Sequence, residues 1–297
     1  AVAITNKNLI KDLEVLFESF IKLIASAIDA KSPYTGGHCS RVPEITMMLA
    51  ESVNDINEGP FAGIQFTDKE MYELKIAAWL HDCGKVATPE AVVDKGTKLE
   101  TIYDRIHTVA TRFEVLKRDE EIKFLKKQLK IQKDNLLSEK EKKDALNKAR
   151  SLYLKRIKQQ VDDKAFIEES NVGGEFMSKD RKDRVKKIAS YRWKDNGSPK
   201  PFFTEDEVYN LCISRGTLTP EERKIINDHI VVTIDMLEQL PYPKHLRNVP
   251  EFAGGHHEKL DGTGYPKGLN HSEMSVQAKI MAIADIFEAL TARDRPY

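Results

Sequence analysis

The chain has 297 residues, of which 40% are hydrophobic, enough for one large core or two smaller ones. Its 47 basic and 47 acidic residues cancel, which excludes a global positive charge of the kind that binds nucleic acid. Three scattered cysteines without C-x-x-C spacing exclude a disulfide framework and favour a reducing compartment. No apolar run approaches the ~18 residues of a membrane span. We therefore expect a cytoplasmic protein that binds neither nucleic acid nor a membrane.

Residues 1–30 are predicted to form a lead helix. Apolar side chains recur there at helical spacing, at Leu9, Leu13, Leu16, Phe20, Leu23 and Ala27. Two interpretations stay open: packing on the helix's own domain, or a coiled coil that transmits a signal from an upstream sensor. Because the sequence starts at Ala1 without an initiator Met, we expect the sensor to be missing from this chain. We also predict a homodimer through this helix.

The first motif that could bind a metal is His81-Asp82-Cys83-Gly84-Lys85, which follows the apolar helical run 76–80. It places an imidazole and a carboxylate side by side. Together these groups suit iron, manganese, cobalt or zinc better than calcium. Cys83 is interpreted as a small buried residue rather than a ligand.

Residues 100–216 are predicted to form an inserted, charged helical region. Ile122, Leu125, Leu129 and Leu136 fall on a heptad-like seam. Ser138 and Glu141 form a capping box that opens a second helix, so we expect a helical hairpin. The excess of basic over acidic residues in the hairpin is interpreted as a helix face exposed to solvent. No function is assigned to the turn-rich stretch 171–199.

The second half of the chain supplies further candidate ligands. Thr219 as N-cap, Pro220 at the first helical position and Glu222 in a capping box predict a helix that presents His229. Two adjacent histidines then precede a glycine-rich turn at 262–264, and an apolar-periodic segment carries an aspartate. The candidate metal ligands are therefore His81, Asp82, His229, His256, His257 and Asp285.

Taken in order, these motifs resemble the HD-GYP phosphodiesterases, a branch of the HD superfamily of metal-dependent phosphohydrolases. The likeness covers roughly residues 25–100 and 217–297 and includes the stretches 29–38, 264–266 (Gly-Tyr-Pro) and 290–297. It implies an all-α fold, a helical bundle around a binuclear metal site, to which this chain adds the inserted hairpin lobe. The catalytic core would comprise 31–99 and 217–297, and the family's C-terminal helix would lie beyond Tyr297.

The resemblance also implies a reaction, the hydrolysis of cyclic di-GMP to the linear dinucleotide pGpG and onward to GMP. It assigns Asp82 as the carboxylate that bridges two metals, His81 and Asp285 to one metal, and His229, His256 and His257 to the other. Iron or manganese is expected, with zinc, cobalt and nickel as alternatives. Some members hold a third metal with a Glu at the position of Tyr34, so we expect two metals here. Two alternatives stay open: a non-catalytic module that binds cyclic di-GMP or a partner protein, and a phosphohydrolase for another nucleotide.

Other residues are assigned to the substrate. Lys85 lies one helical turn after His81 and is predicted to stabilise phosphate oxygens during catalysis. Its alternative role is to cap a helix C-terminus. The resemblance adds Arg295 as a phosphate clamp and Tyr265 as a loop residue beside the pocket, linked to dinucleotide specificity or partner contacts. It also places His38 near the site, as a ligand, a phosphate contact or a packing residue.

Overall fold

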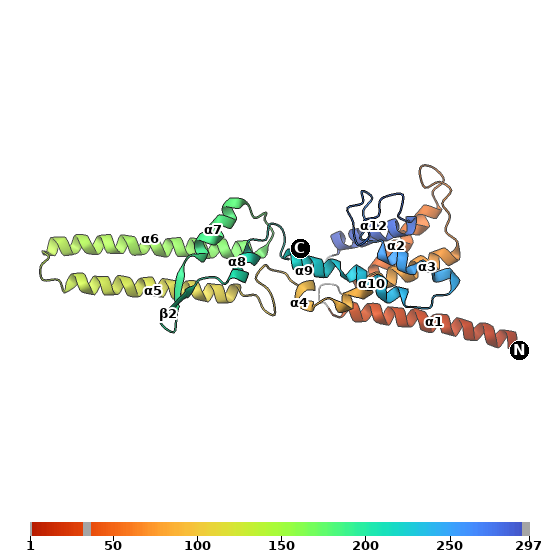
Figure 1. The fold of residues 1–297 in the computed structure, drawn as a ribbon, viewed down its shortest axis with the longest axis horizontal. Coiled ribbons are helices and arrows are strands. Elements are labelled where there is room, and N and C mark those ends of the chain that lie inside the picture. The colour runs from red at the N-terminus through yellow and green to blue at the C-terminus, as the bar shows by residue number, and fades with distance from the viewer. Residues whose placement is uncertain (1, 32–36, 293–297) are drawn as a thin grey trace. The chain divides into compact units, whose positions relative to one another are not determined.

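The computed structural model describes residues 2–31 and 37–292, and helices dominate it (Figure 1). The predicted all-α fold class is confirmed. The chain divides into two units, residues 1–94 with 220–297 and residues 95–219. Across the part of the chain described, no helix combines the length and the apolar character needed to cross a membrane.

The first unit is a bundle of helices from both ends of the chain. Its elements are α1 (Val2–Asp29), α2 (His38–Asn54), α3 (Asp68–Leu80), the 3₁₀ helix η1 (Cys83–Ala87), α4 (Glu90–Val93), α9 (Pro220–Asn227), α10 (His229–Glu238), the 3₁₀ helix η2 (Lys244–Leu246), α11 (Val249–Gly254) and α12 (Val276–Thr291).

Helix α3 forms the centre of the first unit. It begins at a capping box in which Thr67 and Glu70 satisfy each other's backbone N–H groups. Buried side chains along α3 pack against α1, α2 and α11, with Leu74 and Ala77 fully inaccessible to solvent. The apolar run predicted before His81 therefore forms the core, and its burial fixes the end of α3.

One prediction about this unit is wrong in detail. The helix that starts at Pro220 ends at Asn227, and His229 begins a separate helix, α10. The break falls at Asp228, although the backbone N–H of Asp228 still reaches the carbonyl of Lys224. His229 thus lies in the first turn of a helix rather than within one.

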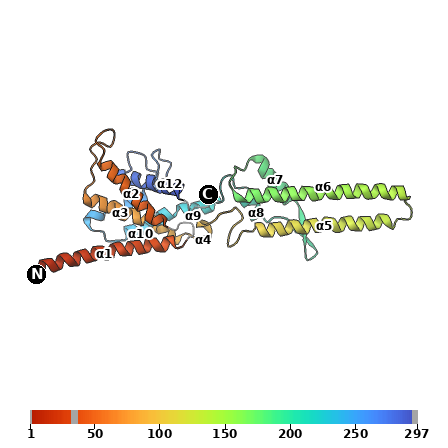
Figure 2. The same ribbon diagram turned by 180° about the vertical axis from the view of Figure 1, so that it is seen from behind.

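The second unit contains the predicted hairpin, whose long helices lie side by side in both views (Figures 1 and 2). Its elements are α5 (Ile106–Gln132), α6 (Glu139–Val172), α7 (Lys179–Ala189), β1 (Arg192–Asp195), β2 (Ser198–Pro201) and α8 (Glu205–Leu211). Ser138 and Glu141 form the predicted capping box.

One expectation about the second unit needs correction. The seam of Ile122, Leu125 and Leu129 is about half exposed, and Leu136 lies in the connecting loop. The core lies instead where α5 and α6 meet α7 and α8, around Phe113. The turn-rich stretch also contains a two-stranded antiparallel hairpin, β1 with β2. Its Asn-Gly turn at 196–197 has positive φ at both residues, a sequence signal for a tight hairpin.

Candidate metal centre

The end of α3 delivers His81 and Asp82 into the interior, where both are buried. Next in the chain, the backbone of η1 lies against α10. A Cβ on Gly84 would lie 2.0 Å from the carbonyl oxygen of His229, so only glycine permits this approach. Gly84 N–H also donates to Thr233 Oγ1 at 2.9 Å. This close packing brings His229 to the side of Asp82.

Three of the histidines are held in the same way. The Nδ1 atoms of His81 and His256 lie 2.7 and 2.6 Å from the carbonyl oxygens three residues earlier, and His229 Nδ1 contacts the carbonyl of Ile226. A carbonyl can only accept, so each Nδ1 carries the proton and each Nε2 presents a lone pair. Such backbone contacts are the usual way in which metal-binding histidines are oriented.

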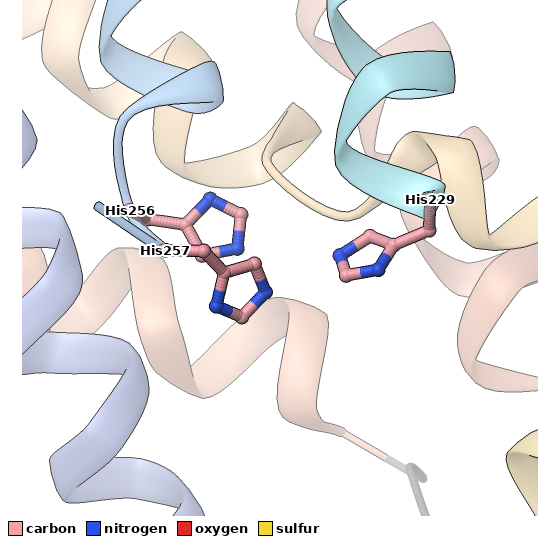
Figure 3. Close-up of side chains that lie close together, drawn as sticks. All are labelled: His229, His256 and His257. Carbon is pink, nitrogen blue, oxygen red and sulfur yellow. The ribbon is translucent and has the colours of Figure 1, made fainter. Parts of the chain in front are cut away.

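His256 and His257 follow the end of α11, and His229 starts α10. The three rings turn toward one another (Figure 3). The rings of His256 and His257 are 4.1 Å apart between centroids, and those of His229 and His257 are 5.1 Å apart. Adjacent residues converge here because they lie beyond the helix, where the ~100° step between neighbours no longer applies.

Asp82 lies between two groups of donors. Its Oδ1 is 3.2 Å from His229 Nε2, while its Oδ2 is 3.3 Å from His81 Nε2 and 3.2 Å from His38 Nε2. On the Oδ2 side, Asp285 Oδ1 is 3.3 Å from His38 Nε2. The two carboxylate oxygens of Asp82 therefore face different sets of ligand atoms.

Donor atoms gather within 4.8 Å of one another in three groups: His229 with His256 and His257, His38 with His81 and Asp285, and His81 with Asp82 and His256. The Nε2 atoms of His81, His229 and His256 and Asp82 Oδ1 are buried without hydrogen-bond partners. Lone pairs that face one another in a buried space repel unless a cation lies among them. The arrangement fits divalent metal binding.

Burial and neighbouring charges shift the pKa values of several of these side chains toward the protonation states that bind metals. Burial lowers the pKa of His257 to about 4 and that of His256 well below its usual range, so both are neutral. Burial alone would raise the pKa values of Asp82 and Asp285. Their cationic and imidazole neighbours, led by Lys85 for Asp82 and His38 for Asp285, lower both pKa values instead. Neutral imidazoles and ionised carboxylates are the forms that bind metals.

His38 belongs among the candidate ligands, which is one of the three roles that the sequence left open for it. It is buried at the start of α2, where the carboxylate of Asp29 accepts from the backbone N–H of Gly37 and Cys39. Its Nδ1 lies 2.5 Å from Glu288 Oε2. Burial lowers the pKa of His38, but Asp285, Asp82 and Glu288 outweigh burial and raise it to about 10. In the absence of a metal the His38 ring is therefore protonated.

Sequence reasoning missed Glu288, a buried carboxylate on α12. Besides His38, it accepts from Arg41 through Nε at 2.7 Å and Nη2 at 2.6 Å. One signal was present, since Glu288 lies three residues after Asp285 and so shares its helix face. Its partners on α2 were not evident, because about 250 residues separate them from Glu288 in the chain.

Comparison with known families agrees with this geometry. A family model described as HD domain matches residues 35–165, and a second HD-domain model matches residues 202–297. The chain belongs to the HD-domain family. The predicted resemblance to this superfamily is thereby confirmed, and the matched ranges contain all six predicted ligands and His38.

Curated relatives match shorter stretches of the chain. A 3′3′-cGAMP-specific phosphodiesterase of Vibrio cholerae is 43% identical over 91 residues, which are 30% of this chain and 19% of that protein. A cyclic di-GMP phosphodiesterase of Thermotoga maritima is 39% identical over 87 residues, 29% of this chain and 23% of the relative. A probable cyclic di-GMP phosphodiesterase of Vibrio cholerae is 38% identical over 89 residues, 28% and 20% respectively. The chain thus matches about a fifth of the length of these proteins.

Lys85 of the HD domain projects from η1 into the pocket that His38 and Asp82 also line. Its ammonium contacts Asp82 Oδ2, and its side chain keeps 25% of its surface accessible. Burial lowers the pKa of Lys85, but the nearby Asp82 carboxylate outweighs burial and raises it, so the ammonium stays charged. The ammonium of Lys31 caps the end of η1 by donating to the carbonyls of Lys85, Val86 and Thr88 at 3.1, 2.8 and 2.5 Å.

The Gly-Tyr-Pro stretch forms one wall of the HD-domain site. The Tyr265 ring stacks on His257 with centroids 4.8 Å apart, and Tyr265 N–H donates to the His257 carbonyl at 3.2 Å. Tyr265 also lines a groove of about 460 Å³. The remaining groove residues are Pro220, Arg223, Lys224, Asn227, Asp228, Val231 and Pro266.

Glu258 is buried, and its carboxylate orients a loop rather than a histidine ring. Its two oxygens accept from the backbone N–H groups of Lys267 and Leu269 at 2.7 and 2.9 Å, so Glu258 holds the loop after the Gly-Tyr-Pro stretch. The histidine rings use backbone carbonyls instead. Two other predicted positions, Tyr34 and Arg295, lie outside the described residues.

Proposed function

We propose that this chain is a metal-dependent phosphodiesterase that hydrolyses cyclic di-GMP. The observation that carries the proposal is the pair of ligand clusters that lie on either side of Asp82. Phosphodiester hydrolysis needs a nucleophile formed at neutral pH, neutralisation of the phosphate charge and in-line geometry, which paired metals supply. The names of the relatives support the class of substrate, since each is named as a phosphodiesterase of a cyclic dinucleotide.

We assign two divalent metals, iron or manganese, to this site. His229, His256 and His257 would hold one, and His81 and Asp285, joined by His38, would hold the other. Asp82 would serve both, because its two oxygens face different groups of ligand atoms. Mixed imidazole and carboxylate ligands favour these metals over calcium. When bound, the metals supply an acidic water and bind phosphate oxygens.

The chain's own residues complete the chemistry. Lys85 presents a charged ammonium at the pocket and offsets charge on the phosphate or on the departing oxygen. Glu288 fixes the orientation of His38, and Arg41 fixes Glu288. Tyr265 offers a ring edge and a hydroxyl beside His257, where a base or ribose of the substrate would lie. Cleavage of one phosphodiester opens the ring to pGpG, and a second cleavage yields GMP.

A second substrate has specific support. Three of the matched Vibrio cholerae relatives are named 3′3′-cGAMP-specific phosphodiesterases. Cyclic di-GMP and 3′3′-cGAMP share the cyclic phosphodiester backbone and differ in one base, so the metal site serves both equally. Discrimination would therefore come from groups that touch the bases, with Tyr265 the nearest candidate.

The test is turnover by protein loaded anaerobically with Fe(II) or Mn(II). Cyclic di-GMP and 3′3′-cGAMP are supplied separately and the products are resolved by chromatography. The linear dinucleotide or mononucleotides support the proposal, and the faster substrate identifies the preference. Two bound metals with tight binding but no product would favour a receptor. Absence of binding to either dinucleotide would point to another nucleotide.

A further inference from the structure

Helix α1 has two apolar faces, and only one of them packs within its own unit. Ile21, Ala25 and Ile28 are buried in the core of the first unit. Contacts with α3 support this docking, since Lys75 Nζ lies 3.3 Å from Glu18 Oε2 and Lys22 lies over the Trp79 ring. The N-terminal end of α1 extends beyond the other helices of this unit (Figures 1 and 2).

The second face is a continuous exposed stripe. Its members recur with alternating steps of four and three residues, the spacing of a heptad seam, and each is between 56% and 62% exposed. The seam consists of Leu9, Leu13, Leu16, Phe20 and Leu23. At ~100° per residue, the seam lies about 120° around the helix from the face that packs on the core. A partner helix on the seam would therefore not displace α1 from its own unit.

The exposed area is large for a face without a partner. Ile10, Phe17 and Ile24 widen the stripe and are between 37% and 58% exposed. Together these eight side chains expose on the order of 700 Å², close to the ~800 Å² that each partner buries in a stable interface. Monomeric proteins rarely expose apolar patches larger than a few hundred Å².

We propose that α1 is a dimerisation helix, and that two copies of this chain pair in parallel through the seam. The seam is self-complementary, because in a parallel, in-register pair each leucine meets its own copy. Asn6 continues the seam one step before Leu9 and is exposed. A single polar Asn at such a position favours a parallel, in-register pair, since the two amides then hydrogen-bond to each other.

The dimer helix would end on the segments that carry site residues. Asp29, the last residue of α1, accepts from the backbone on both sides of His38. Lys31 binds the carbonyls of η1, which carries Lys85. The end of the dimer helix and the segment after it therefore contact the backbone that carries both His38 and Lys85.

The test uses the 297-residue chain and a pair of matched variants. Leu16 and Val15 are adjacent and similarly exposed, at 56% and 58%, but only Leu16 lies on the seam. In sedimentation velocity from about 1 to 100 µM, the unsubstituted chain and Val15→Asp should be dimers. Leu16→Asp should raise the dimer dissociation constant at least ~100-fold, because two buried leucines are lost per dimer. Circular dichroism checks that helicity is unchanged.

A monomeric unsubstituted chain at ~100 µM, or a Leu16→Asp variant that remains dimeric, would overturn the proposal. Orientation is tested by oxidative cross-linking of Leu9→Cys, with the unsubstituted chain as the control for its native cysteines. A parallel pair brings the two Cys side chains together and gives a covalent dimer. A dimer that does not cross-link at this position would refute the parallel arrangement.

Discussion

Substitution of Glu288 by Gln should weaken metal binding without changing any proposed ligand. The Glu288 carboxylate is buried and receives His38 Nδ1 at 2.5 Å and Arg41 through two nitrogens at 2.6 and 2.7 Å. A neutral amide can accept only through its oxygen, so one of these partners loses its acceptor. His38 then loses its fixed orientation toward Asp82 and Asp285.

The expected magnitude is a 10- to 100-fold loss of affinity for one metal, the range that is typical when the partner of a ligating histidine is removed. This equals roughly 1.4 to 2.8 kcal/mol. A calorimetric titration of metal-free protein with Mn(II) should show one weakened site and one unchanged site. Glu44→Gln, an exposed position on α2, is the control and should match the unsubstituted chain. Two unchanged sites in Glu288→Gln would refute the role assigned to Glu288 and to His38.

Three further predictions concern charge and packing. Lys85→Met should retain both metals and lower kcat by about 10²-fold, the scale of one lost electrostatic contact; loss of metal measured by mass spectrometry would contradict the assignment. Burial raises the pKa of Glu288, but its contacts with His38 and Arg41 outweigh burial and lower the pKa to about 2. The ionised carboxylate therefore stabilises the fold fully above about pH 4.5, and this stabilisation is lost as the pH falls toward 2. A Glu288→Gln variant that shows the same decline in Tm between pH 5 and 3 as the unsubstituted chain would refute this. Phe113→Ala in the second unit should cost about 3 to 5 kcal/mol in denaturant unfolding of that unit, and an unchanged midpoint would disprove its place in the core.

The six predicted ligands were accessible from the sequence because each lies in a short local motif, five of them at helix ends and Asp285 within the apolar-periodic helix α12. His81 and Asp82 follow an apolar run, and His256 and His257 precede a glycine-rich turn. The structure brings all six together with His38. Their roles as ligands remain a prediction, which the metal measurements test.

The parts of the site that the sequence did not predict depend on contacts between segments that lie far apart in the chain. Glu288 meets His38 and Arg41 across about 250 residues, and nothing local to either segment shows that they meet. The carbonyl contacts of His81 and His256 are local but depend on where each helix ends, which is the least certain feature of a sequence pattern. In the second unit, periodicity alone suggested a buried seam through Leu136, but most of the packing occurs at the other end of the hairpin.

The central claim is that two metals joined through Asp82 hydrolyse a cyclic dinucleotide. The most direct test is turnover of cyclic di-GMP measured against the number of Mn(II) or Fe(II) ions bound per chain, with both quantities taken from the same anaerobic samples. The account predicts little turnover up to one metal per chain, a steep rise as the second binds, and loss of both metal and turnover in Asp82→Ala. Full turnover at one metal per chain, or full activity in Asp82→Ala, would contradict it.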